Sequence, residues 1–265
     1  MISPFKVTIM SKGMKVLVTG ASGRVGVPFC KAYRDYYSLR LMFHKKVMDA
    51  LPGEVVVSAD ITDLNSVIRA MDGVEAVVHL AADPKVEAPW DSVLSLNIVG
   101  TYNIFEAARK VGVKKVVYAS SNHACGFSVK ELDQVGPDAP IRPDSLYGVS
   151  KVFGEALGRY YADNFSLSVI CLRIGSCPGL EDPSSYVKPF ISGERLHITY
   201  TGEKLAGMWI SNRDMAQLIY RSLESDLKFG IFYGVSDSDH KIFDVSETME
   251  KLGYRPQDRV EDYLR

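Results

Sequence analysis

The sequence contains no apolar run near the roughly 20 residues that a helix needs to cross a membrane. Its first ten residues, M-I-S-P-F-K-V-T-I-M, lack the long apolar segment and the small-residue cleavage site of a signal peptide. We therefore interpret residues 1–13 as an extension before the first strand. No charge of one sign dominates, since 31 Lys and Arg against 32 Asp and Glu give a net charge of -1. No overall field attracts nucleic acid or an anionic membrane, so we expect neither as a partner.

Cysteine is scarce and scattered, at Cys30, Cys125, Cys171 and Cys177. No two of these residues have Cys-x-x-Cys spacing, and no histidine cluster lies beside them. The sequence therefore gives no sign of a disulfide framework or a metal site. We expect buried free thiols in a reducing compartment, hence a cytoplasmic protein, and no bound metal.

Short apolar runs alternate along the chain with longer amphipathic segments. Strands are predicted at Lys15–Thr19, Leu39–Phe43, Val55–Ser58, Ala76–Leu80, Lys115–Ala119 and Leu167–Ile174. Helices are predicted at Arg24–Tyr36, Leu64–Met71, Val93–Val111 and Tyr147–Asn164. Strands that are apolar on both faces and alternate with helices indicate an α/β fold, a doubly wound parallel sheet of the Rossmann type.

The amino-acid composition changes after Gly175, since residues 176–208 are rich in proline and glycine. We expect loops with minor strands there, which suit a small region that covers a substrate. A helix at Asp214–Glu224, a strand at Ile231–Val235 and a helix at Glu247–Leu252 follow. This divides the chain into residues 14–175, a dinucleotide-binding domain, and residues 176–265, a substrate-binding region partly integrated with it.

A glycine-rich turn, T-G-A-S-G-R-V-G, follows the first predicted strand and contains Gly20, Gly23 and Gly26. Glycines between a strand and a helix let the chain turn tightly and bring backbone N–H groups close to a pyrophosphate. Turn glycines also occur by chance, but this position opens an alternating α/β chain.

The segment S-L-Y-G-V-S-K sets Tyr147 and Lys151 four residues apart, on one face of a predicted helix. Such a pair can be an ordinary feature of a helix surface. It can also be catalytic: a tyrosine with a pKa of about 10 is a poor base at neutral pH, and a neighbouring ammonium favours the phenolate. The prediction is that Lys151, together with the positive charge of a bound nicotinamide, lowers the pKa of Tyr147.

Together these motifs resemble the short-chain dehydrogenase/reductase superfamily, in its extended branch of NAD-dependent epimerases and dehydratases. In order along the chain they are the glycine turn, Asp60-Ile61, Leu80-Ala81-Ala82, Y-A-S-S-N-H from Tyr118, and Tyr147-x-x-x-Lys151. The resemblance implies a catalytic Ser121, Tyr147 and Lys151. It also implies a dinucleotide site formed by Gly20, Ser22, Gly23, Arg24, Val25, Gly26, Asp60, Ile61, Leu80, Ala81, Ala82, Asn97, Tyr147, Lys151 and Ile174. Within this set, Asn97 resembles a structural asparagine that helps to position the active-site backbone.

The more specific resemblance is to uronate dehydrogenases, through S-S-N-H at Ser120–His123, G-P-D-A-P-I-R-P-D-S-L-Y-G-V-S-K at Gly136–Lys151, and L-R-I-G-S-C at Leu172–Cys177. It implies that Ser121, Asn122, His123 and Ser176 contact the substrate. His123 could instead be a strand-end residue bonded to backbone, and His79 is expected to be a satisfied core histidine. Two features depart from that family. Asp83 and Pro84 follow the fourth strand, where the family has a serine, and Lys188 is the nearest cation where it has a carboxylate-binding arginine.

The end of the second predicted strand bears on the choice of dinucleotide. An NAD enzyme of this fold places an acidic residue there, but this chain has Phe43 followed by His44, Lys45 and Lys46. These residues can form a basic turn that is merely solvated, or they can attract a 2′-phosphate. We predict NADP or NAD as the cofactor, with NADP slightly favoured and with His44 and Lys45 nearest the 2′-phosphate.

The leading functional hypothesis is an NAD(P)-dependent dehydrogenase that oxidises an aldose or uronate at its anomeric carbon to a lactone, with Tyr147 as the base. One alternative is a nucleotide-sugar epimerase or dehydratase of the same fold, although that needs a larger C-terminal lobe. Another is a redox sensor that binds the cofactor without turnover. From the resemblance, a homodimer formed through the helices at Val93–Val111 and Tyr147–Asn164 is also expected.

Overall fold

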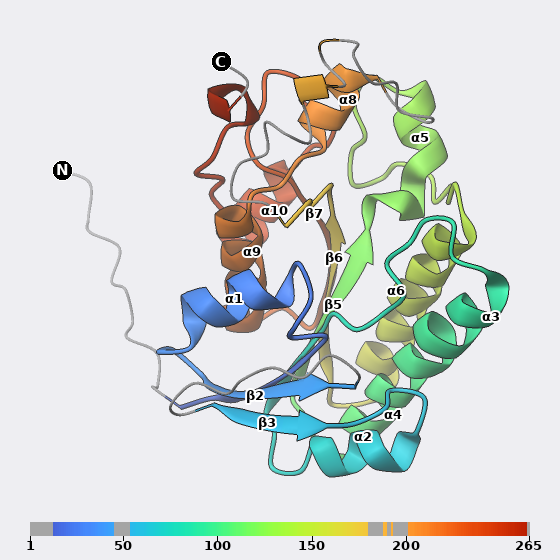
Figure 1. The fold of residues 1–265 in the computed structure, drawn as a ribbon, viewed down its shortest axis with the longest axis vertical. Coiled ribbons are helices and arrows are strands. Elements are labelled where there is room, and N and C mark those ends of the chain that lie inside the picture. The colour runs from blue at the N-terminus through green and yellow to red at the C-terminus, as the bar shows by residue number, and fades with distance from the viewer. Residues whose placement is uncertain (1–12, 45–53, 180–187, 190–191, 193–200, 264–265) are drawn as a thin grey trace.

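The computed structural model describes residues 13–44, 54–179, 188–189, 192 and 201–263. One sheet of parallel strands runs through it in the order β3-β2-β1-β4-β5-β6-β7 (Figure 1). The strands are β1 (Lys15–Thr19), β2 (Ser38–Phe43), β3 (Val55–Ser58), β4 (Ala76–His79), β5 (Lys115–Ser121), β6 (Ser168–Ile174) and β7 (Phe229–Gly234). The chain crosses back at β1 and fills both sides of it, so the predicted doubly wound parallel sheet is confirmed.

Helices cover both faces of this sheet (Figure 1). They are α1 (Gly26–Tyr33), α2 (Leu64–Ala70), α3 (Trp90–Ser92), the π-helical η1 (Val93–Val99), α4 (Gly100–Val111), the 3₁₀ turn η2 (Asn122–Cys125), α5 (Gly126–Glu131), α6 (Leu146–Asn164), α8 (Gly202–Gly207), α9 (Asn212–Glu224), α10 (Ser246–Leu252) and the 3₁₀ turn η3 (Val260–Tyr263). Helices α1 and α9 pack on one face, and α2, α4 and α6 lie on the other. Apolar side chains fill both layers, which explains why the strands are apolar on both faces.

The predicted strands and long helices agree with the structure to within a few residues at each end. The prediction of loops with minor strands for residues 176–208 holds for the described residues 176–179, which are loop with an isolated bridge at Ser176, and is wrong for residues 202–207, which form helix α8. Thr201 caps α8 by accepting a hydrogen bond from the backbone N–H of Lys204. Helix α5 was not predicted at all.

The chain beyond residue 175 is joined to the main sheet. Strand β7 pairs with β6 along its length, and α9 packs against α1. Ser176 forms an isolated bridge with Trp209, with Ser176 N–H donating to the carbonyl oxygen of Met208 at 2.7 Å. The segment M-W-I-S at residues 208–211 therefore lies directly beside the end of β6.

Within the described residues, no helix is long and apolar enough to cross a membrane. The same part of the chain contains no cluster of three or more His, Cys, Asp or Glu side chains placed to hold a metal ion. Cys30, Cys125 and Cys171 are buried free thiols, as predicted, whereas Cys177 is partly exposed.

Candidate active site

A pocket of about 660 Å³ opens at the carboxyl ends of β1, β4, β5 and β6. Parallel strands all end at the same edge of a sheet, so segments that are far apart in sequence meet there. The pocket is lined by Gly20, Ser22, Gly23, Arg24, Val25, Gly26, Leu80, Ala81, Ala82, Pro84, Lys85, Val86, Ala119, Ser120, Ser121, Asn122, His123, Tyr147, Lys151, Ile174, Gly175, Ser176 and Cys177. It therefore brings together the three predicted catalytic residues, the glycine turn and all four predicted substrate contacts.

Tyr147 and Lys151 face the pocket from the first turns of α6. Ser145 caps this helix by accepting a hydrogen bond from the N–H of Gly148 at 3.0 Å. Lys151 is buried, and its Nζ donates to the carbonyl oxygen of Ala119 at 2.8 Å. The same Nζ lies 5.3 Å from the centre of the Tyr147 ring, so an ammonium and a phenol are held one turn apart at the pocket wall.

The pKa values of this pair reflect burial. Burial raises the pKa of Tyr147 to about 12, although a hydrogen bond with Ser121 acts in the opposite direction. Burial lowers the pKa of Lys151 to about 8, opposed by the negative charge of Glu155. Burial is therefore the largest influence on the pKa of Tyr147 here, and the prediction that Lys151 and a cofactor's positive charge together lower that pKa stays a prediction.

Ser121 is the last residue of β5, and the turn after it carries two of the other substrate candidates, Asn122 and His123. Its Oγ donates to Oδ1 of Asn122 and accepts from the N–H of His123, both at 3.2 Å. The Nδ2 of Asn122 contacts Sδ of Met208 at 3.5 Å. These contacts fix the orientation of the two polar side chains at the end of the strand.

Among the described residues, the His123 ring bonds to a carboxylate and not to backbone, as its alternative interpretation would require. Its Nδ1 lies 2.9 and 3.1 Å from the two carboxylate oxygens of Asp144, whose side chain is buried. The His123 ring also meets the Tyr147 ring edge-on, with centres 5.8 Å apart. The interaction with Asp144 orients the imidazole at the wall of the pocket.

The glycine turn has the geometry that a bound pyrophosphate needs. Gly20 has φ of +68°, and a Cβ there would lie 2.8 Å from the backbone N of Ala81. A Cβ on Gly26 would lie 2.6 Å from the carbonyl oxygens of Gly20 and Ala21. Only glycine allows these close approaches, which leave backbone N–H groups at the start of α1 able to bind an anion. The residues present therefore fit a dinucleotide.

Four predicted cofactor contacts lie outside the wall of this pocket: His44, Asp60, Ile61 and Asn97. His44 and Asp60 lie together beyond β2 and β3, with Nε2 and Oδ2 3.5 Å apart. The peptide oxygen of Ile61 accepts from Asn103, and the Ile61 side chain is buried. The fifth such residue, Lys45, lies outside the described residues, as does Lys46.

Asn97 holds the active-site backbone from behind the pocket. Its Oδ1 accepts from the N–H of Asp83 at 2.8 Å, and its Nδ2 donates to the oxygen of Asp83 and to Oγ of Ser150, both at 3.1 Å. It thus connects the turn after β4 to α6, the helix of Tyr147 and Lys151. This contact pattern fits a structural asparagine better than a direct cofactor contact.

Several residues of the pocket wall were not predicted as site residues. Lys85 and Val86 follow the turn after β4, and Gly175 and Cys177 flank Ser176. The sequence could have indicated these residues, because each one adjoins a recognised motif at the end of a strand. Lys85 is exposed and forms no ion pair within the described part of the chain, so it provides a cation at the pocket.

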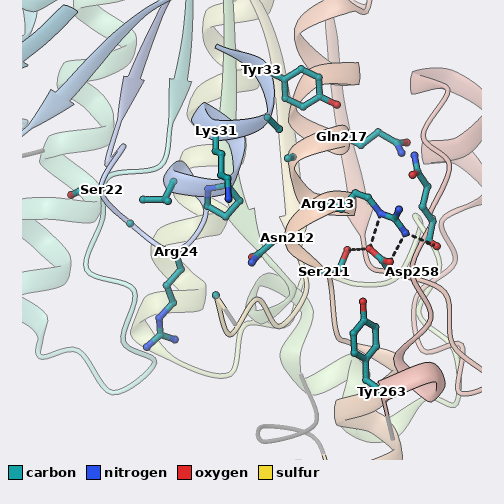
Figure 2. Close-up of a pocket in the computed structure, with 17 residues that line it drawn as sticks. Ser22, Arg24, Lys31, Tyr33, Ser211, Asn212, Arg213, Gln217, Asp258 and Tyr263 are labelled. Carbon is teal, nitrogen blue, oxygen red and sulfur yellow. Dashed lines mark hydrogen bonds and ion pairs between the residues drawn. The ribbon is translucent and has the colours of Figure 1, made fainter. Parts of the chain in front are cut away.

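A larger pocket of about 990 Å³ lies on the other side of the glycine turn, between α1 and α9 (Figure 2). It shares Ser22, Gly23 and Arg24 with the first pocket but contains none of the predicted catalytic residues. Arg213 and Ser211 both donate hydrogen bonds to Asp258 on one side of it, opposite Arg24 and Lys31 (Figure 2). We therefore take the smaller pocket, which contains the predicted catalytic residues, as the candidate active site.

Comparison with known proteins agrees with this geometry. The model of the NAD dependent epimerase/dehydratase family matches residues 16–231. The chain belongs to that family. The predicted superfamily is thus confirmed, and so is an oxidoreductase that uses NAD or NADP.

Three relatives of the chain illustrate its place in the family. It is 40% identical to an NAD-dependent glucose-6-phosphate dehydrogenase of Haloferax volcanii, over 94% of this chain and 95% of the relative. It is 35% identical to an L-arabinose 1-dehydrogenase (NAD(P)(+)) of the same organism, over 92% and 96%. The structure of a uronate dehydrogenase from Agrobacterium tumefaciens matches with a TM-score of 0.80 and 33% identity, over 96% of this chain and 88% of that one. The predicted resemblance to uronate dehydrogenases is confirmed.

Proposed function

We propose that the protein oxidises an aldose, either neutral or carrying a carboxylate or phosphate group, at the anomeric carbon to a lactone. The observation that carries the proposal is the single pocket in which Ser121, Tyr147 and Lys151 meet the glycine turn. The named relatives act on a sugar phosphate, on L-arabinose and on a uronate, which supports an aldose as the substrate class.

Tyr147 serves as the base in this proposal. It accepts the proton of the anomeric hydroxyl while hydride leaves the same carbon, and Ser121 donates a hydrogen bond to the sugar oxygen. Lys151 places a positive charge 5.3 Å from the ring that becomes negative. When bound, the oxidised dinucleotide supplies the hydride acceptor and a further positive charge.

The wall of the pocket also suggests how the sugar is held. His123, oriented by Asp144, and Ser176 offer polar groups for sugar hydroxyls. Lys85 offers a cation to a carboxylate or phosphate, as a point charge without the two-pronged geometry of arginine. Lys188, the nearest cation where uronate dehydrogenases have a carboxylate-binding arginine, is exposed. Residues 180–187, which connect it to the pocket wall, lie outside the described part of the chain.

A spectrophotometric screen tests the proposal. Glucose 6-phosphate, L-arabinose, glucuronate and neutral hexoses are each supplied with NAD and with NADP, and the reduced cofactor is followed at 340 nm. We expect turnover with at least one sugar and none in Tyr147→Phe. Conversion of nucleotide-sugars without net reduction would instead support an epimerase, and cofactor binding without any turnover would support a redox sensor.

We further propose that NADP is accepted and slightly favoured over NAD. Strand β2 ends at Phe43, so the described residues place no carboxylate at the position that usually binds both ribose hydroxyls. One observation weakens the proposal, since His44 already lies 3.5 Å from Asp60. Of the three cations that follow Phe43, Lys45 and Lys46 are then the candidates for a 2′-phosphate, and both lie outside the described residues. Each charge-assisted contact is worth about 1.5–3 kcal/mol, enough for a tenfold preference.

The cofactor proposal is tested by kcat/KM for both dinucleotides in the wild type, Lys45→Ala and Lys46→Ala. We expect the lysine variants to lose affinity for NADP and keep it for NAD. Lys114→Ala is the matched control, because Lys114 is exposed at the opposite edge of the sheet, before β5. A wild type that favours NAD tenfold or more would contradict the proposal.

We also propose that the chain forms a homodimer through the helices α4 and α6. Tyr102 on α4 and Val149 and Tyr160 on α6 are exposed apolar side chains, which supports such a face. Light scattering after gel filtration tests this, and a monomeric mass at micromolar concentration would contradict it.

A further inference from the structure

A buried ion pair lies behind the active-site pocket and has no part in the chemistry proposed above. It joins Glu155 of α6 to Arg173 of β6, whose side chains are 2% and 4% exposed. Two parallel hydrogen bonds connect them, Nε to Oε1 and Nη2 to Oε2, each 2.9 Å long. Burying two charges is costly even in this geometry, so a buried pair is weak grounds for stability alone.

Glu155 connects the catalytic helix to the strand that ends in Ser121. Glu155 follows Lys151 by one helical turn and Tyr147 by two, so the three side chains project from one side of α6. Oε1 of Glu155 also accepts a hydrogen bond from Oγ of Ser120 at 2.6 Å. The residue immediately before Ser121 is therefore tied to the helix that carries the base.

Arg173 reaches the residue on the other side of Ser121 by way of two more side chains. Its Nη1 donates to the hydroxyl oxygen of Tyr233 at 2.9 Å. That oxygen lies 3.3 Å from Sγ of Cys125, which donates in turn to the carbonyl oxygen of Asn122 at 3.4 Å. One buried hydrogen-bonded chain thus contacts both neighbours of Ser121.

We infer that Glu155 and Arg173 are positioning residues that hold the turn Ser120–Asn122 in register with Tyr147 and Lys151. The inference rests on the proposed catalytic role of Ser121 and Tyr147. Its physical basis is that hydride and proton transfer need close alignment, so that a displacement of about 1 Å can cost roughly 100-fold in rate. A merely structural pair would affect folding but not the rate of the folded enzyme.

The first experiment separates these roles by comparing the single variants Glu155→Leu and Arg173→Met with the double variant Glu155→Leu/Arg173→Met. Removal of one partner leaves the other charge buried and unpaired, whereas apolar replacement of both residues often restores stability. We expect lower Tm in each single variant and a Tm near that of the wild type in the double variant. The kcat of the double variant should stay at least about tenfold low, with the Kd for NAD within about threefold of the wild type. Recovery of kcat together with Tm would overturn the inference.

The second experiment removes one hydrogen bond without removing a charge, and it applies even if the charge variants fail to fold. Ser120→Ala deletes the 2.6 Å bond to Glu155. Ser236→Ala is the control, because buried Ser236 donates a bond of the same length to buried Asp214, away from the pocket, and also accepts one from the N–H of Ser211 at 3.0 Å. We expect the control to lose at least as much Tm as Ser120→Ala, but only Ser120→Ala should lower kcat, by about five- to thirtyfold.

Ser120→Ala should also raise the primary isotope effect measured with sugar deuterated at the anomeric carbon, because misalignment slows the hydride step. Equal kcat in Ser120→Ala and Ser236→Ala would overturn the inference. The result for Tyr147→Phe distinguishes this failure from that of the proposed function. An inactive Tyr147→Phe with an unaffected Ser120→Ala rejects only the positioning role, whereas an active Tyr147→Phe rejects both.

Discussion

Buried His79 makes the stability of the protein depend on pH in a predictable way. The imidazole is 2% exposed, with Nδ1 2.8 Å from Oγ1 of Thr19 and Nε2 3.3 Å from Oγ1 of Thr101. It is the satisfied core histidine that the sequence predicts. Burial, with a smaller effect of the positive charge of Lys151, lowers its pKa from 6.5 to about 3.

Whether stability rises or falls with pH depends on how many protons the folded and unfolded states bind. Below pH 6.5 the unfolded chain takes up a proton on His79, while the folded protein does not until about pH 3. The unfolded state is therefore favoured as pH falls, and stability increases with pH across this window. Between pH 7 and pH 5 the unfolded chain gains most of one proton, which corresponds to a loss of about 2 kcal/mol in the free energy of unfolding.

Urea unfolding of the wild type and His79→Gln at pH 7, 6 and 5 measures this effect. Glutamine can still bond to the two threonines but does not titrate, so the decrease between pH 7 and pH 5 should be about 2 kcal/mol smaller in the variant. Carboxylates that titrate contribute equally to both proteins. Exposed His240→Gln is the control and should follow the wild type. Equal decreases in the wild type and His79→Gln would refute the reasoning.

Further predictions concern the pocket. Tyr147→Phe should abolish turnover with the Kd for NAD nearly unchanged by fluorescence titration, and one tenth of the wild-type kcat would exclude Tyr147 as the base. Lys151→Ala should impair both kcat and cofactor affinity in the same two assays. Ser121→Ala should lower kcat by about one to three orders of magnitude, whereas His123→Ala should raise KM unequally among sugars; equal loss for every sugar would count against substrate contact. Gly26→Ala should weaken NAD binding at least about tenfold by titration, because its Cβ would meet two carbonyl oxygens at 2.6 Å, and an unchanged Kd would exclude this cradle.

The fold was predictable where one local pattern governs a whole element. The strand Val55–Ser58 begins with three consecutive valines, and Gly112, with φ of +79°, marks the end of the long helix before β5. Helix α5 could not be found in this way. It is short, and a Cβ on its first residue, Gly126, would meet the carboxylate of Asp144, which is 18 positions away in sequence. Its formation depends on tertiary packing that no local pattern records.

The site was predictable to the extent that its residues stand at the ends of strands. The motifs around Gly20, Ala81, Ser121 and Ser176 gather at one edge because parallel strands force their carboxyl ends together. Arg173 shows what the sequence conceals. An arginine inside an apolar strand gives no sign of its partner, since nothing local indicates that β6 faces Glu155 on α6.

The electrostatics of the catalytic pair were the least predictable feature. Spacing alone shows that a cation lies near Tyr147, but the effect of that cation depends on how much water both groups lose. In the folded protein the pKa of Tyr147 is raised to about 12 and that of Lys151 is lowered to about 8, and burial is the largest cause of both shifts. Burying either the Tyr147 phenolate or the Lys151 ammonium alone costs free energy, and the attraction between the two opposite charges reduces that cost when both are present. In the function proposed above, Tyr147 would therefore lose its proton most readily while a positively charged, oxidised cofactor is bound beside it.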